Sequence, residues 1–159
     1  MSETSKSRTD RLPRVRVACI VVQDEAILLV RHVKGDKTYW LLPGGGVDYG
    51  EAAGDALIRE MKEETHLNIE LGDLVFVNDS IPPDGHRHVI NLYFTAKVRG
   101  GELARGPDSN LAELKFVPLE DLPKLEFYPD IRDQLIPAIR AGFPRRALYL
   151  GNLWITKKA

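Results

Sequence analysis

Residues 44–67 read GGGVDYGEAAGDALIREMKEETHL, a run of glycines followed by a segment with helical periodicity. Apolar residues recur at four-residue spacing in this segment, which predicts an amphipathic helix from about Glu51 to Thr65. The residues of the apolar stripe are Ala53, Leu57 and Met61. One face of the helix should therefore pack on a core, and the opposite face is left for another role.

Three carboxylates fall on one side of this helix. Glu60, Glu63 and Glu64 lie three and four positions apart, and side chains at that spacing share a face. Like charges there repel by roughly several tenths of a kcal/mol, which Arg59 offsets only in part. Mg²⁺ would offset the repulsion better, because it prefers carboxylate oxygens and keeps waters for substrate phosphates. Spacing alone leaves a solvated acidic face as the alternative.

The glycines ahead of the helix suggest where a phosphate would lie. Gly44, Gly45 and Gly46 let the backbone approach a ligand closely, and the start of a helix presents free N–H groups. We therefore take Gly45 and Gly46 as candidate substrate-binding residues. A metal-binding face next to a loop that admits phosphate favours phosphoryl chemistry, in which a carboxylate orients an attacking water.

The spacing of these residues resembles the Nudix box of the Nudix hydrolases, which include MutT-like and ADP-ribose pyrophosphatase-like enzymes. The box is Gly, five residues, Glu, seven residues, Arg-Glu, an aliphatic, any residue, Glu-Glu, any residue, Gly and an aliphatic. Gly45, Glu51 and the run Arg59–Leu67 (REMKEETHL) match it. The departure is His66, where the box has its second glycine. His66 can end the helix in the left-handed conformation, at a cost of about 1 kcal/mol, and the alternative is a slightly different helix exit.

The resemblance implies a role for each matched residue. The expected ligands of Mg²⁺, or of Mn²⁺ as a substitute, are Gly44 (through its carbonyl), Glu51 (through water), Glu60, Glu63 and Glu64. Arg59 would hold a carboxylate in place by a charge-assisted pair. Glu60 is alternatively the base that activates water. The candidate catalytic residues are Glu60, Glu64, Arg59 and Glu113.

Glu113 enters that set because many Nudix enzymes draw a further carboxylate from a later loop. Two acidic residues of this chain are candidates for the role, Glu113 first and Asp108 second. Neither is matched by the box itself, so this expectation depends on how the later part of the chain folds.

The remaining pattern predicts strands before and after one central helix, with a second helix near the end. The expected strands are 14–22, 26–32, 38–42, 68–71, 74–81, 88–98 and 113–118, and the second helix is 130–141, capped by Asp130. This order predicts either the α+β class or a three-layer sandwich with a mixed sheet, not a regular βαβ succession. The resemblance sharpens it to an α/β/α sandwich with a mixed β-sheet, on which the box helix packs.

The 159 residues suffice for one domain, which we place at 13–142. Residues 1–12 are predicted to be a flexible polar tail. The segment 143–159 is unusual because it is apolar and follows the last helix. It is interpreted either as an added edge strand or as a surface that packs on a second copy of the chain in a homodimer.

The overall composition indicates a soluble globular protein. The 22 Lys and Arg residues balance 23 Asp and Glu, which argues against a general nucleic-acid binder. The chain has one cysteine, Cys19, expected as a small buried strand residue, and its start has no apolar signal-peptide region. No stretch reaches the ~20 apolar residues of a membrane span. We expect a cytoplasmic protein without a membrane partner.

The substrate is less well defined by the sequence. Pro83 lies sixteen residues after Leu67, an offset that resembles a mark of ADP-ribose pyrophosphatases, although an ordinary loop explains it equally well. Arg87 is a candidate for phosphate binding at the edge of the same loop, or simply an exposed residue. His32 is interpreted as the end of a strand rather than as a ligand.

These features favour a magnesium-dependent pyrophosphohydrolase that cleaves a nucleoside diphosphate linked to another group, with ADP-ribose or another nucleotide sugar preferred. A (d)NTP or oxidised-nucleotide pyrophosphatase is the alternative within the same class. A Nudix-fold sensor that binds such a nucleotide without cutting it is the alternative from another class. A sensor would be expected to lack box carboxylates, whereas this chain keeps all four glutamates.

Overall fold

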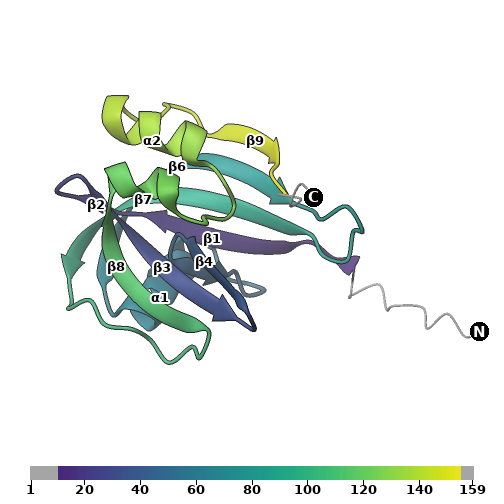
Figure 1. Ribbon diagram of the computed structural model, residues 1–159, viewed down its shortest axis with the longest axis horizontal. Coiled ribbons are helices and arrows are strands. Elements are labelled where there is room, and N and C mark those ends of the chain that lie inside the picture. Colours follow the sequence, from purple (N-terminus) through teal and green to yellow (C-terminus); the bar gives the residue numbers. More distant parts are fainter. Residues whose placement is uncertain (1–10, 155–159) are drawn as a thin grey trace, which may run out of the picture.

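The computed structural model describes residues 11–154 (Figure 1). In chain order the elements are β1 (Arg14–Ile20), β2 (Val22–Gln23), β3 (Ala26–Lys34), β4 (Lys37–Leu41), β5 (Gly44–Gly46), α1 (Ala53–Thr65), β6 (Asn68–Ser80), β7 (Val89–Gly100), β8 (Leu111–Pro118), the 3₁₀ helix η2 (Leu119–Lys124), α2 (Arg132–Ala141) and β9 (Leu148–Asn152). Most of the tail predicted over residues 1–12 lies outside the described residues.

The strands form two sheets. The first has five strands in the order β5-β1-β7-β6-β9. It is mixed, because β1 is parallel to β7 and β9 to β6, while the other neighbours are antiparallel. The second is antiparallel and places β3 between β4 and β8, with β2 also paired to β3. The predicted α+β class and mixed sheet are confirmed.

Alternation along β1 shows how the layers are arranged. Its residues Val17 and Cys19 belong to the core under α1, whereas Ala18 and Ile20 belong to the core that includes residues of η2 and α2. Side chains alternate across a strand, so the two helices cover opposite faces, as Figure 1 shows. The result is the expected α/β/α sandwich. Cys19 is fully buried in it, and burial raises the pKa of its thiol to about 12.

The glycines before α1 form β5, which pairs with β1 rather than making the loop that the sequence suggested. A Cβ on Gly44 would lie 1.9 Å from the carbonyl oxygen of Val17, so only glycine fits against β1 there. The other end of α1 is as expected. His66 has φ 61° and ψ 16°, and its N–H donates to the carbonyl of Lys62 at 3.1 Å.

Two strands predicted separately, 68–71 and 74–81, are one strand, β6. Its pairing with β7 shifts register between Leu71 and Leu74. The N–H of Asp73 donates to Oγ1 of Thr95 at 3.0 Å, and a Cβ on Gly72 would lie only 2.3 Å from that oxygen. The glycine therefore marks a β-bulge that is hydrogen-bonded to the neighbouring strand β7, not a turn.

Both helices begin later than predicted. The helix α1 starts at Ala53, because Glu51 lies before it and turns its carboxylate towards other partners. The helix α2 starts at Arg132 with Ile131 as N-cap. Asp130 still serves this helix end, since its carboxylate accepts the N–H of Arg132 at 3.3 Å and pairs with the guanidinium at 2.7 Å.

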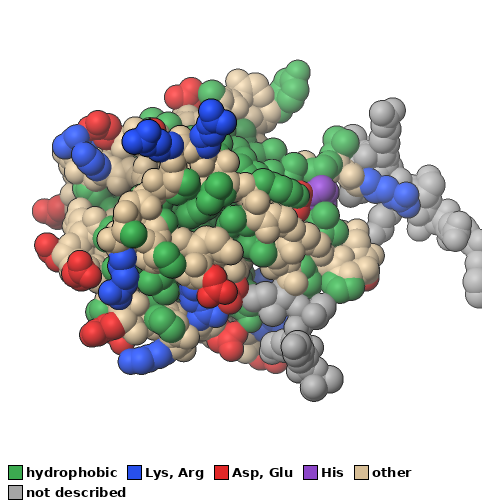
Figure 2. Space-filling model, turned by 90° about the horizontal axis from the view of Figure 1, so that it is seen from above, with side chains coloured by type: hydrophobic (Ala, Val, Ile, Leu, Met, Phe, Trp, Pro, Cys, Tyr) green, Lys and Arg blue, Asp and Glu red, His purple; other side chains and the backbone are tan. Residues whose placement is uncertain are grey.

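The C-terminal segment forms the edge strand β9 on β6, one of the two interpretations made from the sequence. Leu148 and Tyr149 remain exposed there, at 46% and 66%. Figure 2, which views the molecule from the α2 and β9 side, shows apolar side chains gathered over the middle of this face and charged ones mostly around it. No helix within residues 11–154 is long and apolar enough to cross a membrane.

Candidate active site

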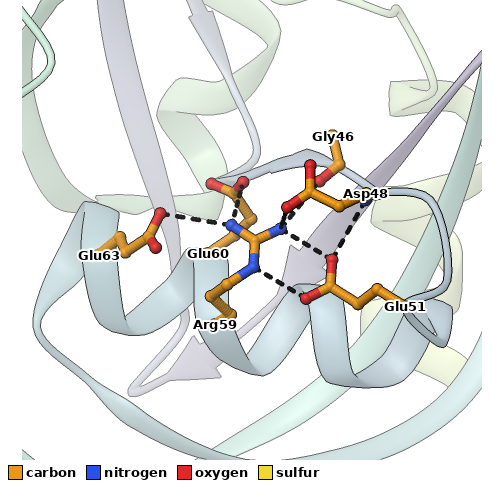
Figure 3. A network of polar contacts seen from close by, with 6 residues as sticks. All are labelled: Gly46, Asp48, Glu51, Arg59, Glu60 and Glu63. Atoms are coloured by element: carbon orange, nitrogen blue, oxygen red, sulfur yellow. Dashed lines mark hydrogen bonds and ion pairs between the residues drawn. The ribbon is translucent and has the colours of Figure 1, made fainter.

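Arg59 on α1 is the centre of a network of carboxylates (Figure 3). Its Nε and Nη2 donate to the two oxygens of Glu51, both at 2.9 Å, which is the bidentate arrangement expected for the strongest ion pairs. Its Nη1 donates to Glu60 at 2.9 Å and reaches Glu63 at 3.4 Å. Its Nη2 also donates to the carbonyl of Gly46 at 3.1 Å. Arg59 thus ties the helix to the loop and to β5.

The network fixes the charge of its members. The hydrogen bonds from Arg59 and from the backbone of Asp48 lower the pKa of Glu51 to about 2. The same contacts with Glu51 and Glu60 raise the pKa of Arg59 above its ordinary value. Arg59 and Glu51 therefore stay ionised over the whole working range of pH, which suits a role in holding other groups in place.

Glu60 lies directly beneath the glycine strand. A Cβ on Gly45 would lie 2.2 Å from the carboxyl carbon of Glu60, so the absence of a side chain at Gly45 is what lets this carboxylate reach β5. The Glu60 side chain is 19% exposed, and burial raises its pKa despite the hydrogen bond from Arg59. Gly45 and Glu60 are thus matched to each other in space.

Glu64 is the most perturbed acid of the site. Its pKa is raised to about 7, mainly by burial. The nearby Glu60 and Asp108 contribute to this rise, whereas Arg16 and a hydrogen bond from the backbone of Gly44 oppose it. Cations favour the charged form of a carboxyl group and burial disfavours it. The positive charge near Glu64 is therefore too weak to offset the burial of its carboxyl. A carboxyl in a cleft whose pKa is raised in this way is typical of a functional site.

A cavity of about 330 Å³ joins these groups to residues of both sheets. One wall is β5 with Glu60 and Glu64 of α1. The other members that matter chemically are Arg14, Arg16, His32 and Asp108. The cavity therefore has an acidic side on the helix and a basic side on β1, an arrangement that suits a metal ion on one side and phosphate oxygens on the other.

The structure separates the two candidates for a later carboxylate. Asp108 lines the cavity, whereas Glu113 is paired with Arg31 at 3.0 Å and Lys115 at 3.3 Å. Strand parity explains the second placement. The neighbours of Glu113 along β8, Leu114 and Phe116, pack on the core under α1, and alternation turns Glu113 towards the opposite face.

The loop before β8 brings Asp108 to the site because it is docked on the end of α1. The N–H of Ala104 donates to the carbonyl of Thr65, and that of Gly106 to the carbonyl of Glu64, both at 3.0 Å. A Cβ on Gly106 would lie 2.2 Å from the carbonyl oxygen of Glu63, so glycine permits this close approach. The loop is therefore fixed to α1 at Gly106, two residues before Asp108, and this contact places Asp108 near the site.

Pro83 and Arg87 lie in the loop between β6 and β7 and do not line the cavity. The guanidinium of Arg87 lies 5.1 Å from the centre of the Trp154 ring. Only the end of the loop approaches the cavity, where Val89 forms part of the wall and the carbonyl of His88 accepts the N–H of Arg14 at 2.9 Å.

Sequence reasoning missed three polar residues of the cavity wall, Arg14, Arg16 and His32. Arg16 donates to the carbonyl of Leu42 at 2.7 Å, which fixes it beside β5. His32 has a buried Nε2 with no hydrogen-bond partner among the described residues. Burial lowers the pKa of His32. The negative charge of Asp108 opposes this effect, and the positive charge of Arg16 adds to it. No signal in the sequence pointed to Arg16, because the glycines were predicted as a loop and the β1–β5 register that places Arg16 opposite Gly46 is seen only in the structure.

The comparison with protein families agrees with this geometry. A family model described as the NUDIX domain matches residues 12–139. The chain belongs to the Nudix family. The Nudix box thus coincides with β5, the loop after it and α1, and the matched domain ends inside α2.

Individual relatives differ in what they are named for. An ADP-ribose pyrophosphatase of Methanocaldococcus jannaschii is 41% identical over 116 residues, which are 72% of this chain and 68% of that protein. A putative 8-oxo-dGTP diphosphatase of Bacillus subtilis is 36% identical over 108 residues, 67% of this chain and 68% of that protein. Three other curated relatives are matched over between 31% and 51% of their length.

Solved structures extend the likeness to the fold. A Nudix hydrolase from Nitrosomonas europaea superposes with a TM-score of 0.72 at 22% identity, over 82% of this chain and 90% of that one. Nudix hydrolases act on phosphoric anhydride bonds with a divalent metal ion, and this chain is a hydrolase of that class.

The carboxylates of the Nudix box fit a divalent metal in their chemistry. Within residues 11–154, no three acidic or histidine side chains already converge as a ligand group. Instead the guanidinium of Arg59 lies among Glu51, Glu60 and Glu63. The carboxyl of Glu64 is buried beside acidic neighbours, so a cation there would relieve its desolvation.

Proposed function

We propose that the chain is a magnesium-dependent pyrophosphohydrolase that cleaves a nucleoside diphosphate linked to another group, with ADP-ribose or another nucleotide sugar as the favoured substrate. The observation that carries this proposal is the carboxyl of Glu64, whose pKa is raised mainly by burial. It lies near the carboxylate of Glu60, which contacts Gly45 in the glycine strand β5. Family membership supports the chemistry, and the geometry supports the particular residues.

In this proposal the metal ligands are Glu60, Glu63, Glu64 and the carbonyl of Gly44, with Glu51 acting through water. Mg²⁺, or Mn²⁺ in its place, would neutralise charge on the diphosphate and lower the pKa of a bound water. Arg59 keeps Glu51 and Glu60 in place by its hydrogen bonds. Either Glu60 or Glu64 is the base that takes the proton of the attacking water, since both are partly buried and both have raised pKa values.

The basic side of the cavity would bind the substrate. Arg16 is fixed by the carbonyl of Leu42, so it can meet a phosphate oxygen without reorganising. Arg14 is exposed and its guanidinium reaches the edge of Gly46, where it too can meet a phosphate oxygen. Gly46 leaves room for the diphosphate next to the carboxylates, whereas the space beside Gly45 is taken by the carboxylate of Glu60. Pro83 and Arg87 lie outside the cavity, which favours an indirect contribution from their loop.

The identity of the linked group rests on weaker support. The archaeal relative is named as an ADP-ribose pyrophosphatase, and it has the higher identity of the two relatives compared above. Pro83 points in the same direction. The Bacillus subtilis relative is named as a putative 8-oxo-dGTP diphosphatase, which keeps an oxidised (d)NTP as the second candidate.

A substrate panel tests this proposal. The purified chain is incubated with ADP-ribose, other nucleotide sugars, dinucleotides, dNTPs including 8-oxo-dGTP, and capped RNA, each with Mg²⁺, Mn²⁺ or EDTA. We expect metal-dependent release of AMP from ADP-ribose with the highest kcat/KM of the panel. Preference for an oxidised dNTP would shift the substrate class, and binding without turnover across the panel would favour the sensor.

We predict that Asp108, not Glu113, supplies the later carboxylate. Asp108→Asn should lower kcat by roughly 10- to 100-fold, because it removes a charge facing Glu64 and the metal ligands. Glu113→Gln is the matched control and should stay within about 2-fold, since its partners Arg31 and Lys115 lie outside the cavity. Steady-state kinetics with a Mg²⁺ titration decides between them, and the reverse order of effects would restore Glu113.

Two further expectations from the sequence remain predictions. A homodimer would have to use a surface such as the exposed side chains of Leu148 and Tyr149 on β9. Light scattering of the full chain measures its mass in solution. A cytoplasmic location likewise stays a prediction.

A further inference from the structure

The chain continues past the matched domain into a segment that reaches back to the active-site end of the first sheet. The family match ends at residue 139, and β9 with the two residues after it lies beyond this limit. Figure 1 shows β9 alongside β6. The last residue of β9, Asn152, pairs with Asp79, close to where the β6–β7 loop, residues 81–88, begins. In the sheet, β6 and β7 lie between β9 and β1, which carries the cavity residues Arg14 and Arg16.

Asn152 holds the first residue of the loop. Its side-chain Oδ1 accepts the N–H of Ile81 at 3.0 Å, and its Nδ2 donates to the carbonyl of Ile81 at 3.2 Å. The N–H of Leu153 donates to the carbonyl of Asp79 at 2.9 Å. Gly151, with φ 79°, lies in the register shift that lets Asn152 reach this position. The side-chain amide of Asn152 thus makes the two backbone hydrogen bonds with Ile81 that a neighbouring strand would otherwise make.

Asp79 ties the last residue of the loop to the same segment. Its carboxylate is hydrogen-bonded to Nε2 of His88 at 2.6 Å and accepts the hydroxyl of Tyr149. These two contacts, the one with His88 first, lower the pKa of Asp79. The carboxylate therefore stays ionised near neutral pH and links β6, β9 and the loop at one point.

Trp154 holds the middle of the loop. The guanidinium of Arg87 lies over its ring at 5.1 Å, and the ring of His86 meets it edge-on, with centres 6.3 Å apart and planes at 88°. A cation on the face of a tryptophan is worth about 0.5–1 kcal/mol at an exposed site. Ile81, His86 and Arg87 thus contact the segment 148–154 directly, and His88 is linked to it through Asp79.

The loop in turn fixes the beginning of β1. The carbonyl of His88 accepts the N–H of Arg14, and the next residue, Val89, pairs with Arg14 in the parallel β1–β7 register. The side chain of Arg14 lines the cavity beside Gly46. Contacts therefore run without a break from Trp154 through the loop to a cation in the cavity wall.

We propose that Asn152 and Trp154 are positioning residues that fix the loop 81–88 and thereby hold Arg14 where it binds a phosphate oxygen of the substrate. The phosphate ligand rests on the proposed function, whereas the fixing of the loop does not. Arginine suits this task because its planar donors match phosphate oxygens when the side chain is held in place.

The test combines hydrogen exchange with binding and kinetics on the full chain. In Trp154→Ala and Asn152→Ala, amide exchange in residues 81–88 and at Arg14 should speed up by about 5-fold or more, the factor that ~1 kcal/mol represents. The Kd for ADP and the KM for the best panel substrate should rise by a similar factor, with kcat within 2-fold. Trp154→Phe should restore most of the binding, because it keeps an aromatic face.

Leu148→Ala is the matched control, since it removes an apolar side chain from the same strand without touching the loop. Unchanged exchange in both variants would overturn the fixing of the loop. Faster exchange with unchanged Kd and KM would overturn the positioning of Arg14. A wild-type chain that cleaves no panel member refutes the proposed hydrolysis separately, because the exchange and ADP-binding measurements do not depend on turnover.

Discussion

Replacing Glu64 with glutamine is expected to abolish metal-dependent hydrolysis, with kcat falling by about 10³-fold or more. The amide keeps the shape of the side chain but removes the negative charge that a hard cation requires. It also removes the ionisable carboxyl whose raised pKa would allow Glu64 to take a proton from water. Steady-state turnover of the best panel substrate with saturating Mg²⁺ measures the effect.

The same variant should be more stable than the wild type when metal is absent. The pKa of Glu64 is about 7 in the folded chain, above the ~4.5 of an exposed glutamate, so its contribution to stability is fully present at low pH and is lost as pH rises through 7. At pH 8 the buried carboxylate therefore destabilises the wild type by up to about 3 kcal/mol.

Thermal unfolding in EDTA at two pH values separates this effect from general damage. Glu64→Gln should unfold at a higher temperature than the wild type at pH 8 and at nearly the same temperature at pH 5. Added Mg²⁺ should raise the unfolding temperature of the wild type more than that of the variant. Full turnover in Glu64→Gln, or a lower unfolding temperature at pH 8, would contradict the assignment.

The part of the site that lies within one helix could be predicted from the sequence. The four-residue periodicity of α1 placed Glu60, Glu63 and Glu64 on a common face because helical geometry is local. The left-handed exit at His66 followed in the same way and is confirmed. The fold class was accessible for a related reason, since the order of strands and helices restricts the layers that a chain can form.

The part of the site that depends on packing between distant segments could not be predicted. Nothing near Asp108 in the sequence shows that Gly106 docks on the carbonyls at the end of α1. Glu113 was preferred although its strand parity turns it away, because the register of β8 on β3 was unknown. His32 likewise enters the cavity only through the meeting of the two sheets.

Two glycines of β5, Gly44 and Gly45, should differ sharply when each is replaced by alanine. In Gly44→Ala the new Cβ would lie 1.9 Å from the backbone oxygen of Val17, which is held in the buried strand β1 and cannot move aside. We expect this variant to lose roughly 3 kcal/mol of unfolding free energy, at the upper end of the effect of overpacking.

In Gly45→Ala the new Cβ would meet only the carboxylate of Glu60, at 2.2–2.6 Å, and that group is the end of a flexible side chain. Glu60 can swing away, which breaks its contact with Arg59 at 2.9 Å but leaves the strands paired. Stability should fall by less than about 1 kcal/mol, whereas kcat should fall by about 10²-fold, the effect of displacing a reacting group by about 1 Å.

Chemical denaturation and steady-state kinetics on the same preparations compare the two variants. Gly100→Ala is the control for a strand glycine, because a Cβ there would make only an ordinary contact at 3.6 Å. If Gly45→Ala keeps wild-type kcat, the fit between Gly45 and Glu60 has no part in catalysis. If it instead unfolds as readily as Gly44→Ala, then Glu60 is held too rigidly to yield, and its carboxylate is a structural part of β5 and α1.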